Sequence, residues 1–169
     1  VRAVFECGIG SNDPSVPSNM GRLGKPGASL RAWRDYFPNA YVVGFDIDER
    51  VLFQEDRIRT LHVDQTSMES IENAWKQLDP LRYDLVVDDG LHEFRAGVSL
   101  FQSAWSRVKR GGIYAIEDVN ARDLLRYQRY FSGTTLWISY IIMKQEGEPG
   151  VGDNSLILIR KTADSTSSV

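Results

Sequence analysis

Short apolar runs alternate with segments of helical spacing through most of this sequence, and this alternation limits the fold more than any other feature. The first five runs are apolar through their middle, as is typical of strands covered on both faces of a parallel sheet. The runs are Val1–Cys7, Tyr41–Asp46, Ile58–Asp64, Tyr83–Asp89, Ile113–Asp118, Thr135–Met143 and Ser155–Ile159.

Apolar residues three and four positions apart predict helices between the runs. The three clearest sets are Leu30, Trp33 and Phe37; Met68, Ile71, Trp75 and Leu78; and Val98, Phe101, Trp105 and Val108. Ser67 and Asn120 are predicted helix starts, and Gly111–Gly112 is a predicted helix stop. We therefore predict an α/β fold: a doubly wound, Rossmann-like, mostly parallel seven-stranded sheet. The last two runs have no helix between them and predict a C-terminal antiparallel hairpin.

Length and composition exclude several classes of protein. The 169 residues suit one domain, predicted over 1–161, with a small polar tail over 162–169 that we expect to fray. A net charge of −3 is too small to indicate a nucleic acid or an anionic membrane as partner. Cys7 is the single cysteine, which favours a reducing, cytoplasmic location over a disulfide scaffold. No apolar run approaches the roughly 20 residues that span a bilayer. The sequence begins directly with an apolar, strand-like run, so we expect further chain upstream of Val1.

In doubly wound sheets, ligands bind beyond the carboxyl ends of the strands, so the residues that follow each run are the candidate site. Gly8 and Gly10 follow the first run and permit a tight turn close to a ligand, although a tight turn alone would also explain them. A dinucleotide fingerprint requires a third glycine where Asp13 stands, and this disfavours a nicotinamide or flavin dinucleotide.

Carboxylates end the second and third runs. Asp46 is the candidate ligand for ribose hydroxyls, whereas Asp48 can simply begin the helix that follows. Asp64 and Gln65 offer the carboxylate and amide that an adenine amino group would use, but Asp64 serves equally well as a helix cap. His62 and Cys7 are interpreted as packed or edge residues, because neither has a partner for catalysis nearby in sequence.

Four carboxylates end the fourth and fifth runs, and they are the most informative feature of the chain. Asp88 and Asp89 would lie beside Glu117 and Asp118, where they would repel one another unless a cation sat between them. Oxygen ligands suit a hard dication such as Mg²⁺, Mn²⁺ or Ca²⁺. His92 follows closely enough to act as a base there. The alternative is that these are solvated strand-end charges and that His92 caps a helix.

These motifs resemble class I S-adenosylmethionine-dependent methyltransferases, over about residues 4–161. The resemblance is closest to the macrocin O-methyltransferase and cephalosporin hydroxylase-like group, whose members mainly modify hydroxyls on sugars of antibiotics and glycans. The segments that carry it are FECGIGSNDPSVPSNMG, GKPGASLRAWRDYFPNA, GFDID, VDDGLHE and GGIYAIEDV, including the long insertion from Ser11 to Pro26. One departure is Leu91, which replaces the serine usual in that group.

The resemblance implies a role for each strand-end residue. It implies S-adenosylmethionine contacts at Glu6, Gly8, Gly10, Asp46, Asp64 and Asp88, a metal site, most simply for Mg²⁺, at Asp89, Glu117 and Asp118, and a general base at His92. Asp88 is also the alternative metal ligand. The expected activity is metal-assisted O-methylation of a hydroxyl on a sugar or glycosylated natural product. A nicotinamide-dependent oxidoreductase and a cofactor-binding module without turnover are the alternatives. The expected partner is a small-molecule or glycoside acceptor, with self-association possible.

Overall fold

The computed structural model describes residues 1–142 and 154–162. Four α-helices and eight strands make up this part of the chain, together with two 3₁₀ turns at Glu49–Val51 and Trp105–Arg107. In chain order the elements are β1 (Ala3–Cys7), α1 (Ala28–Tyr36), β2 (Tyr41–Asp46), β3 (Gln54–Glu55), β4 (Ile58–His62), α2 (Met68–Lys76), β5 (Tyr83–Asp88), α3 (Phe94–Ala104), β6 (Val108–Val119), α4 (Ala121–Tyr130), β7 (Trp137–Ile141) and β8 (Ser155–Arg160).

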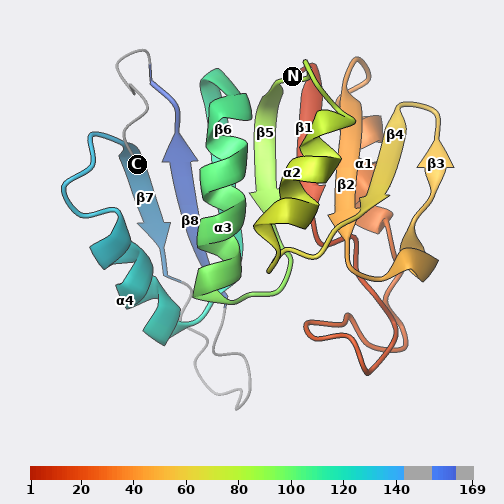
Figure 1. Ribbon diagram of the computed structural model, residues 1–169, viewed down its shortest axis with the longest axis horizontal. Coiled ribbons are helices and arrows are strands. Elements are labelled where there is room, and N and C mark those ends of the chain that lie inside the picture. Colours follow the sequence, from red (N-terminus) through yellow and green to blue (C-terminus); the bar gives the residue numbers. More distant parts are fainter. Residues whose placement is uncertain (143–153, 163–169) are drawn as a thin grey trace.

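The strands form one sheet in the order β3-β4-β2-β1-β5-β6-β8-β7 (Figure 1). The pairs among β4, β2, β1, β5 and β6 are parallel, and strand order reverses on either side of β1. This confirms the doubly wound prediction. The predicted strand count of seven was wrong, because β3 pairs antiparallel with β4 at the edge. β3 has only two residues, both exposed, so it carries no apolar pattern that could predict it.

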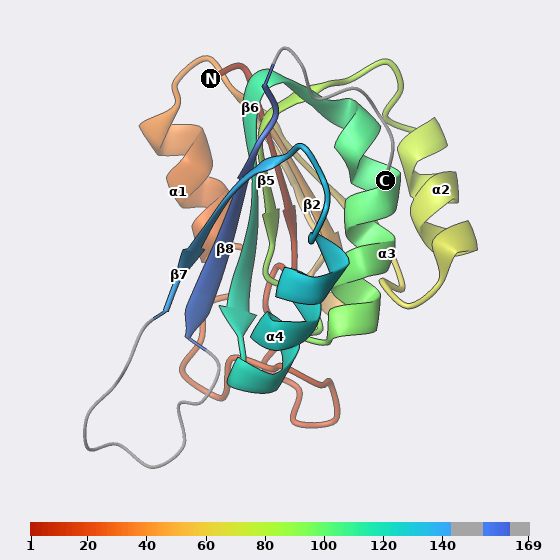
Figure 2. The same cartoon turned by 90° about the vertical axis from the view of Figure 1, so that its left-hand side faces the viewer.

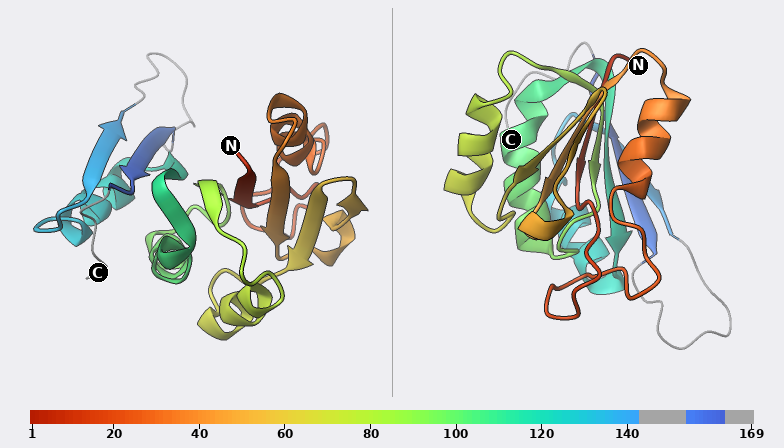
Figure 3. Two further views of the ribbon diagram at one scale, coloured as in Figure 1. Left: turned by 90° about the horizontal axis from the view of Figure 1, so that it is seen from above. Right: turned by 90° about the vertical axis from the view of Figure 1, so that its right-hand side faces the viewer.

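Helices cover both faces of the sheet. Seen edge-on, α1 lies on one side, and α2 and α3 lie on the other (Figure 2; also the two views of Figure 3). α1 encloses the smaller core with residues such as Val4, Leu30 and Val42. The larger core lies under α2, α3 and α4, where the ring of Phe5 packs 4.8 Å from that of Trp75. The alternation of side chains along each strand divides the two cores, because successive residues face opposite sides of the sheet.

Two predicted helix starts are confirmed. The Ser67 side chain accepts a hydrogen bond from the Ser70 N–H at the start of α2, and Asn120 accepts one from the Asp123 N–H at the start of α4. Each satisfies a backbone donor that has no partner within its helix.

The third predicted helix ends earlier than its apolar spacing indicates. α3 stops at Ala104, and Val108 is the first residue of β6 instead of the last on a helical face. Gly111–Gly112 consequently lies inside a strand. Pairing of Tyr83 with Val108 draws this segment into the sheet, so tertiary contacts override a local pattern.

The C-terminal hairpin is confirmed, since β8 pairs antiparallel with both β6 and β7. The loop from Glu146 to Asp153 lies outside the described residues. So does the predicted tail over 162–169, except for its first residue, Thr162. In the described ranges, no helix has both the length and the apolar character needed to cross a membrane.

Candidate active site

The carboxyl ends of five parallel strands meet at one edge of the sheet, which is the lower edge in Figure 1. Strand register sets which residues become neighbours there. Cys7 is paired with both Phe45 and Asp88, and Asp88 is paired with Ile116. The residues just beyond these pairs, Gly8 and Asp89 among them, therefore line the same crevice.

A pocket of about 830 Å³, part of it open to solvent, lies at this edge. We call it the larger pocket, to distinguish it from a smaller cavity behind the ends of β5 and β6. Five predicted site residues line it: Gly8, Gly10, Asp46, Asp64 and Asp89. Val16, Pro17 and Ser18 from the insertion close one side, and Ser18 donates a hydrogen bond to the Leu91 carbonyl.

Gly8 and Gly10 form a tight left-handed loop, with φ values of 92° and 90°. A side chain at position 8 would collide with the Asp89 carbonyl, so glycine is required for the two loops to touch. The Asp46 carboxylate holds this loop by accepting hydrogen bonds from the N–H groups of Ile9 (2.7 Å) and Gly10 (3.2 Å). Asp46 also accepts from the Asp48 N–H, so three of the roughly four acceptor positions of the carboxylate are used within the protein and about one is left for a ligand.

The neighbouring carboxylates have local structural partners. Asp48 caps the Glu49–Val51 turn, as predicted, and its hydrogen bond to Arg50 lowers its pKa to about 2. Asp64 accepts from the N–H and hydroxyl of Thr66, while Ser67 caps the helix that follows. The helix-cap interpretation of Asp64 is therefore wrong, and its side chain lines the larger pocket instead.

Glu6 lies beneath the crevice, on the α1 side of the sheet. Its carboxyl accepts hydrogen bonds from the Ser29 hydroxyl and, at 2.6 Å, from Trp33 Nε1. The side chain is buried and does not line the larger pocket. Burial, which outweighs these hydrogen bonds, raises the pKa of Glu6 to about 7, with a further contribution from Asp89 and Glu117.

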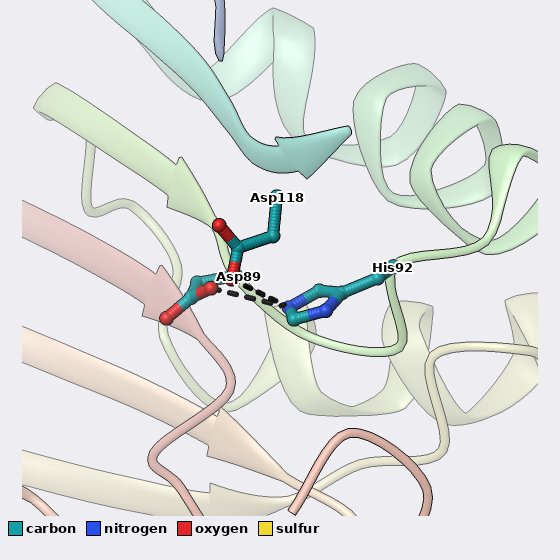
Figure 4. A group of neighbouring side chains, drawn as sticks. All are labelled: Asp89, His92 and Asp118. Atoms are coloured by element: carbon teal, nitrogen blue, oxygen red, sulfur yellow. Dashed lines mark hydrogen bonds and ion pairs between the residues drawn. The ribbon is translucent and has the colours of Figure 1, made fainter. Parts of the chain in front are cut away.

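Asp89, His92 and Asp118 converge at the ends of β5 and β6 (Figure 4). One ligand atom from each lies within 4.8 Å of the others. His92 Nε2 is 3.2 Å from Asp89 Oδ1 and 4.0 Å from Asp118 Oδ2. The two carboxylates offer oxygen donors that suit a hard divalent cation, so the residues present fit a metal, and the imidazole lies beside them. His92 does not cap α3, since Glu93 precedes that helix, and the alternative interpretation of His92 is wrong.

His92 and Asp118 also have left-handed backbones, with φ values of 58° and 48°. This conformation costs a residue other than glycine about 1–2 kcal/mol, although histidine and aspartate adopt it more readily than most. Such conformations persist where the surrounding structure enforces them, and they concentrate at functional sites.

A smaller cavity lies behind this group, between the sheet, α3 and α4. His92, Glu117, Asp118 and the buried Asp88 line it. Asp88 Oδ1 accepts a hydrogen bond from Gln65, while Asp88 Oδ2 is buried without a hydrogen-bond partner among the described residues. Burial raises the pKa of Asp88 to about 6. The pKa of Glu117 is also raised, by burial first and then by Asp89 and Asp118. Glu117 stands outside the converging group of three.

The buried Cys7 thiol is not a nucleophile, because burial raises its pKa well above the usual range. Nothing in the sequence pattern indicates a role at the site for two residues that have one in the structure. Tyr127 of α4 lines the smaller cavity, and Trp33 of α1 holds Glu6. The sequence indicates Gln65 only as an adenine contact, whereas its position beside Asp88 follows from the packing of β4 against the rest of the sheet.

No protein-family model matches the chain. Curated relatives do match, and two of them are as follows. A rhamnosyl tetracenomycin-C 2′-O-methyltransferase from Streptomyces olivaceus is 32% identical over 132 residues, which are 78% of this chain and 32% of that protein. The mycinamicin VI 2″-O-methyltransferase of Micromonospora griseorubida is 36% identical over 93 residues, 55% of this chain and 23% of that protein. The curated homologues of this chain are therefore sugar O-methyltransferases of the macrocin type.

A solved structure shares the fold of this chain. The MycE methyltransferase from the mycinamycin biosynthetic pathway, in complex with Mg, SAH and mycinamycin VI, matches with a TM-score of 0.66 at 22% identity. The match covers 99% of this chain and 47% of that one. The chain thus has the fold of nearly half of that structure, and it spans only about a third or less of the length of the two curated relatives.

Proposed function

We propose that this chain is the catalytic domain of a metal-assisted, S-adenosylmethionine-dependent O-methyltransferase that acts on a sugar hydroxyl of a glycosylated small molecule. The observation that carries the proposal is the convergence of Asp89, His92 and Asp118 beside the pocket that the Gly8–Gly10 loop lines. The activities named for the curated homologues support the same reaction.

The roles that we infer divide the site into three parts. The cofactor residues are Glu6, Gly8, Gly10, Asp46, Asp64 and Asp88; the metal ligands are Asp89, Glu117 and Asp118; and the general base is His92. Four of the six cofactor residues line the larger pocket. Of the other two, Glu6 lies beneath the glycine loop and Asp88 lines the smaller cavity.

The chain's own residues bring an acceptor hydroxyl and a base together. When bound, S-adenosylmethionine would supply an activated methyl group, and a divalent cation would lower the pKa of the acceptor hydroxyl. His92 Nε2 faces the Asp89–Asp118 pair, so it can take the proton of a hydroxyl held against that pair. The neighbouring carboxylates then stabilise the imidazolium. The hydroxyl oxygen gains the methyl group, and the products are a methyl ether and S-adenosylhomocysteine. The protein mainly supplies alignment.

The relatives suggest the acceptor. Their names specify rhamnosyl tetracenomycin-C, mycinamicin VI and L-olivosyl-oleandolide, each methylated at a numbered oxygen. We infer an acceptor of this kind, a deoxysugar attached to a polyketide. Self-association and a cytoplasmic location stay predictions from the sequence.

The test is incubation of the chain with S-adenosylmethionine, Mg²⁺ and a panel of such glycosides, followed by mass spectrometry. We expect one methyl group on the sugar and none in the presence of a chelator. Calorimetric titrations with S-adenosylhomocysteine and NAD separate the alternatives. Binding of NAD alone would favour an oxidoreductase, whereas binding of S-adenosylhomocysteine without methyl transfer to any acceptor would favour a module without turnover.

A further inference from the structure

We propose that Gln65 is a positioning residue that holds the loop carrying Asp89 and His92 in the geometry needed for metal binding and proton transfer. This inference deepens the proposed function and rests on it. Gln65 follows β4 and is buried, and it lines both the larger pocket and the smaller cavity. Gln65 therefore forms part of the wall between the larger pocket, where we propose that the cofactor binds, and the smaller cavity behind the proposed metal site.

Both ends of the Gln65 amide are bonded to the segment 88–91. Gln65 Nε2 donates to Asp88 Oδ1 at 2.6 Å, and Gln65 Oε1 accepts from the Leu91 N–H at 2.9 Å. The two bonds enclose Asp89 and Gly90, so the amide bridges the start and the middle of the loop. The contact is tight, because a side chain at Gly90 would collide with Gln65 Oε1.

The loop needs such a bridge because its conformation is not the one its own backbone favours. His92 is left-handed, and its imidazole must point back toward Asp89, three residues earlier. Leu91 is the residue immediately before His92, so fixing the Leu91 N–H limits the rotations that would swing the imidazole away. Groups that orient metal ligands through hydrogen bonds typically change metal affinity or activity about 10–100-fold when removed.

The same geometry restricts how Gln65 can contact adenine. Its carboxamide has two N–H donors and two acceptor positions on the carbonyl oxygen. One acceptor position is used by the Leu91 N–H, and one donor is used by a carboxyl that is buried with it. A base could therefore meet only the second donor or acceptor position, because breaking either existing bond would leave a buried polar group without its partner.

The test compares Gln65→Met with Gln77→Met. The first variant keeps the length of the side chain and loses both hydrogen bonds. The matched control changes an exposed glutamine just after α2, whose amide contacts the Asn73 carbonyl at 3.4 Å. The measurements are urea denaturation, hydrogen exchange at the Leu91 amide by NMR, Mn²⁺ affinity from electron paramagnetic resonance, and S-adenosylhomocysteine affinity from calorimetry.

In Gln65→Met we expect faster exchange at Leu91 and an Mn²⁺ affinity lower by about tenfold or more, with S-adenosylhomocysteine affinity within about threefold of wild type. Gln77→Met should change none of these quantities. Gly90→Ala should reproduce the loss of Mn²⁺ affinity, because its methyl group would displace Gln65 Oε1.

Two results would overturn the proposal. Unchanged exchange at Leu91 together with unchanged Mn²⁺ affinity would mean that the bridge holds nothing in place. A loss confined to S-adenosylhomocysteine affinity would mean that Gln65 contacts the nucleoside. Failure of the proposed function is distinguishable from both, because wild-type protein would then bind no Mn²⁺ or transfer no methyl group while Leu91 exchange still depended on Gln65.

Discussion

His92 Nε2 lies 3.2 Å from Asp89 Oδ1, three residues earlier in the same loop. Asp118 reaches the same nitrogen, at 4.0 Å, from a different strand. A local contact and a long-range contact therefore meet at one imidazole atom (Figure 4). Asp118 lies on β6 and His92 lies in the loop after β5, so each can be replaced without changing the other. The metal role and the proton-transfer role can therefore be tested by separate substitutions.

Replacement of His92 tests its role as the base. His92→Asn is preferable to an alanine variant because asparagine tolerates the left-handed backbone found there. We expect turnover to fall by about 10²-fold or more, with S-adenosylhomocysteine affinity unchanged. Steady-state kinetics and calorimetry measure the two quantities. His62→Asn, at the half-exposed histidine of β4, is the control. Wild-type turnover in His92→Asn would refute the assignment.

Replacement of Asp118 tests the metal site. Asp118→Asn keeps a residue that accepts a left-handed φ and removes one negative charge. In Asp118→Asn we expect Mn²⁺ affinity to fall by about tenfold or more. In the wild-type protein we expect activity to depend on added Mg²⁺ and to disappear with a chelator. Asp56→Asn is the control, because that side chain is 90% exposed. Full activity in excess chelator would remove the metal from the mechanism.

Replacement of Glu6 should change how stability depends on pH. Burial raises the pKa of Glu6 to about 7 from an ordinary value of 4.5, so folding favours its protonated form. The free energy of unfolding should fall as pH rises from 4.5 to 7, because the unfolded chain releases this proton first. Glu6→Gln can accept from Trp33 and donate to Ser29 without a charge. It should be more stable than wild type at pH 8, by roughly 1–3 kcal/mol, and the difference should shrink at pH 5.

Urea denaturation at the two pH values measures the effect of Glu6→Gln. Asp88, whose pKa burial raises to about 6, contributes a slope of the same sign in both proteins, so the difference between them isolates Glu6. Glu69→Gln, on the exposed face of α2, is the control. An equal gain or loss at both pH values would contradict the prediction.

Gly97 makes room for Tyr127 at the smaller cavity. A methyl group at position 97 would collide with the Tyr127 hydroxyl and lie 3.2 Å from Asp88 Oδ2. Gly97→Ala should therefore destabilise the protein by about 1–3 kcal/mol, even though alanine favours a helix. Tyr127→Phe removes the colliding oxygen, so the double variant should recover much of the loss. A double-mutant cycle from urea denaturation measures the coupling, and additive effects would count against this packing.

Much of the fold followed from apolar periodicity. The predicted runs Tyr41–Asp46 and Tyr83–Asp89 begin at the same residues as β2 and β5, because strands buried on both faces must be apolar throughout. The pattern failed where burial did not decide the structure. The strand β3 is exposed and polar, and the helix-like spacing that reaches Val108 gave way to pairing with β5.

By itself, the sequence determined that acidic and glycine residues terminate successive buried strands, because this depends only on local pattern and on the rule that parallel strands end at a common edge. Tertiary structure alone decided which of these residues meet. Strand register brought Asp118 to Asp89 and His92, sheet alternation turned Glu6 toward α1, and the packing of β4 set Gln65 beside Asp88. These contacts join residues that are far apart in the chain. Their closeness in space is a property of the whole fold, so no single segment of the sequence could predict it.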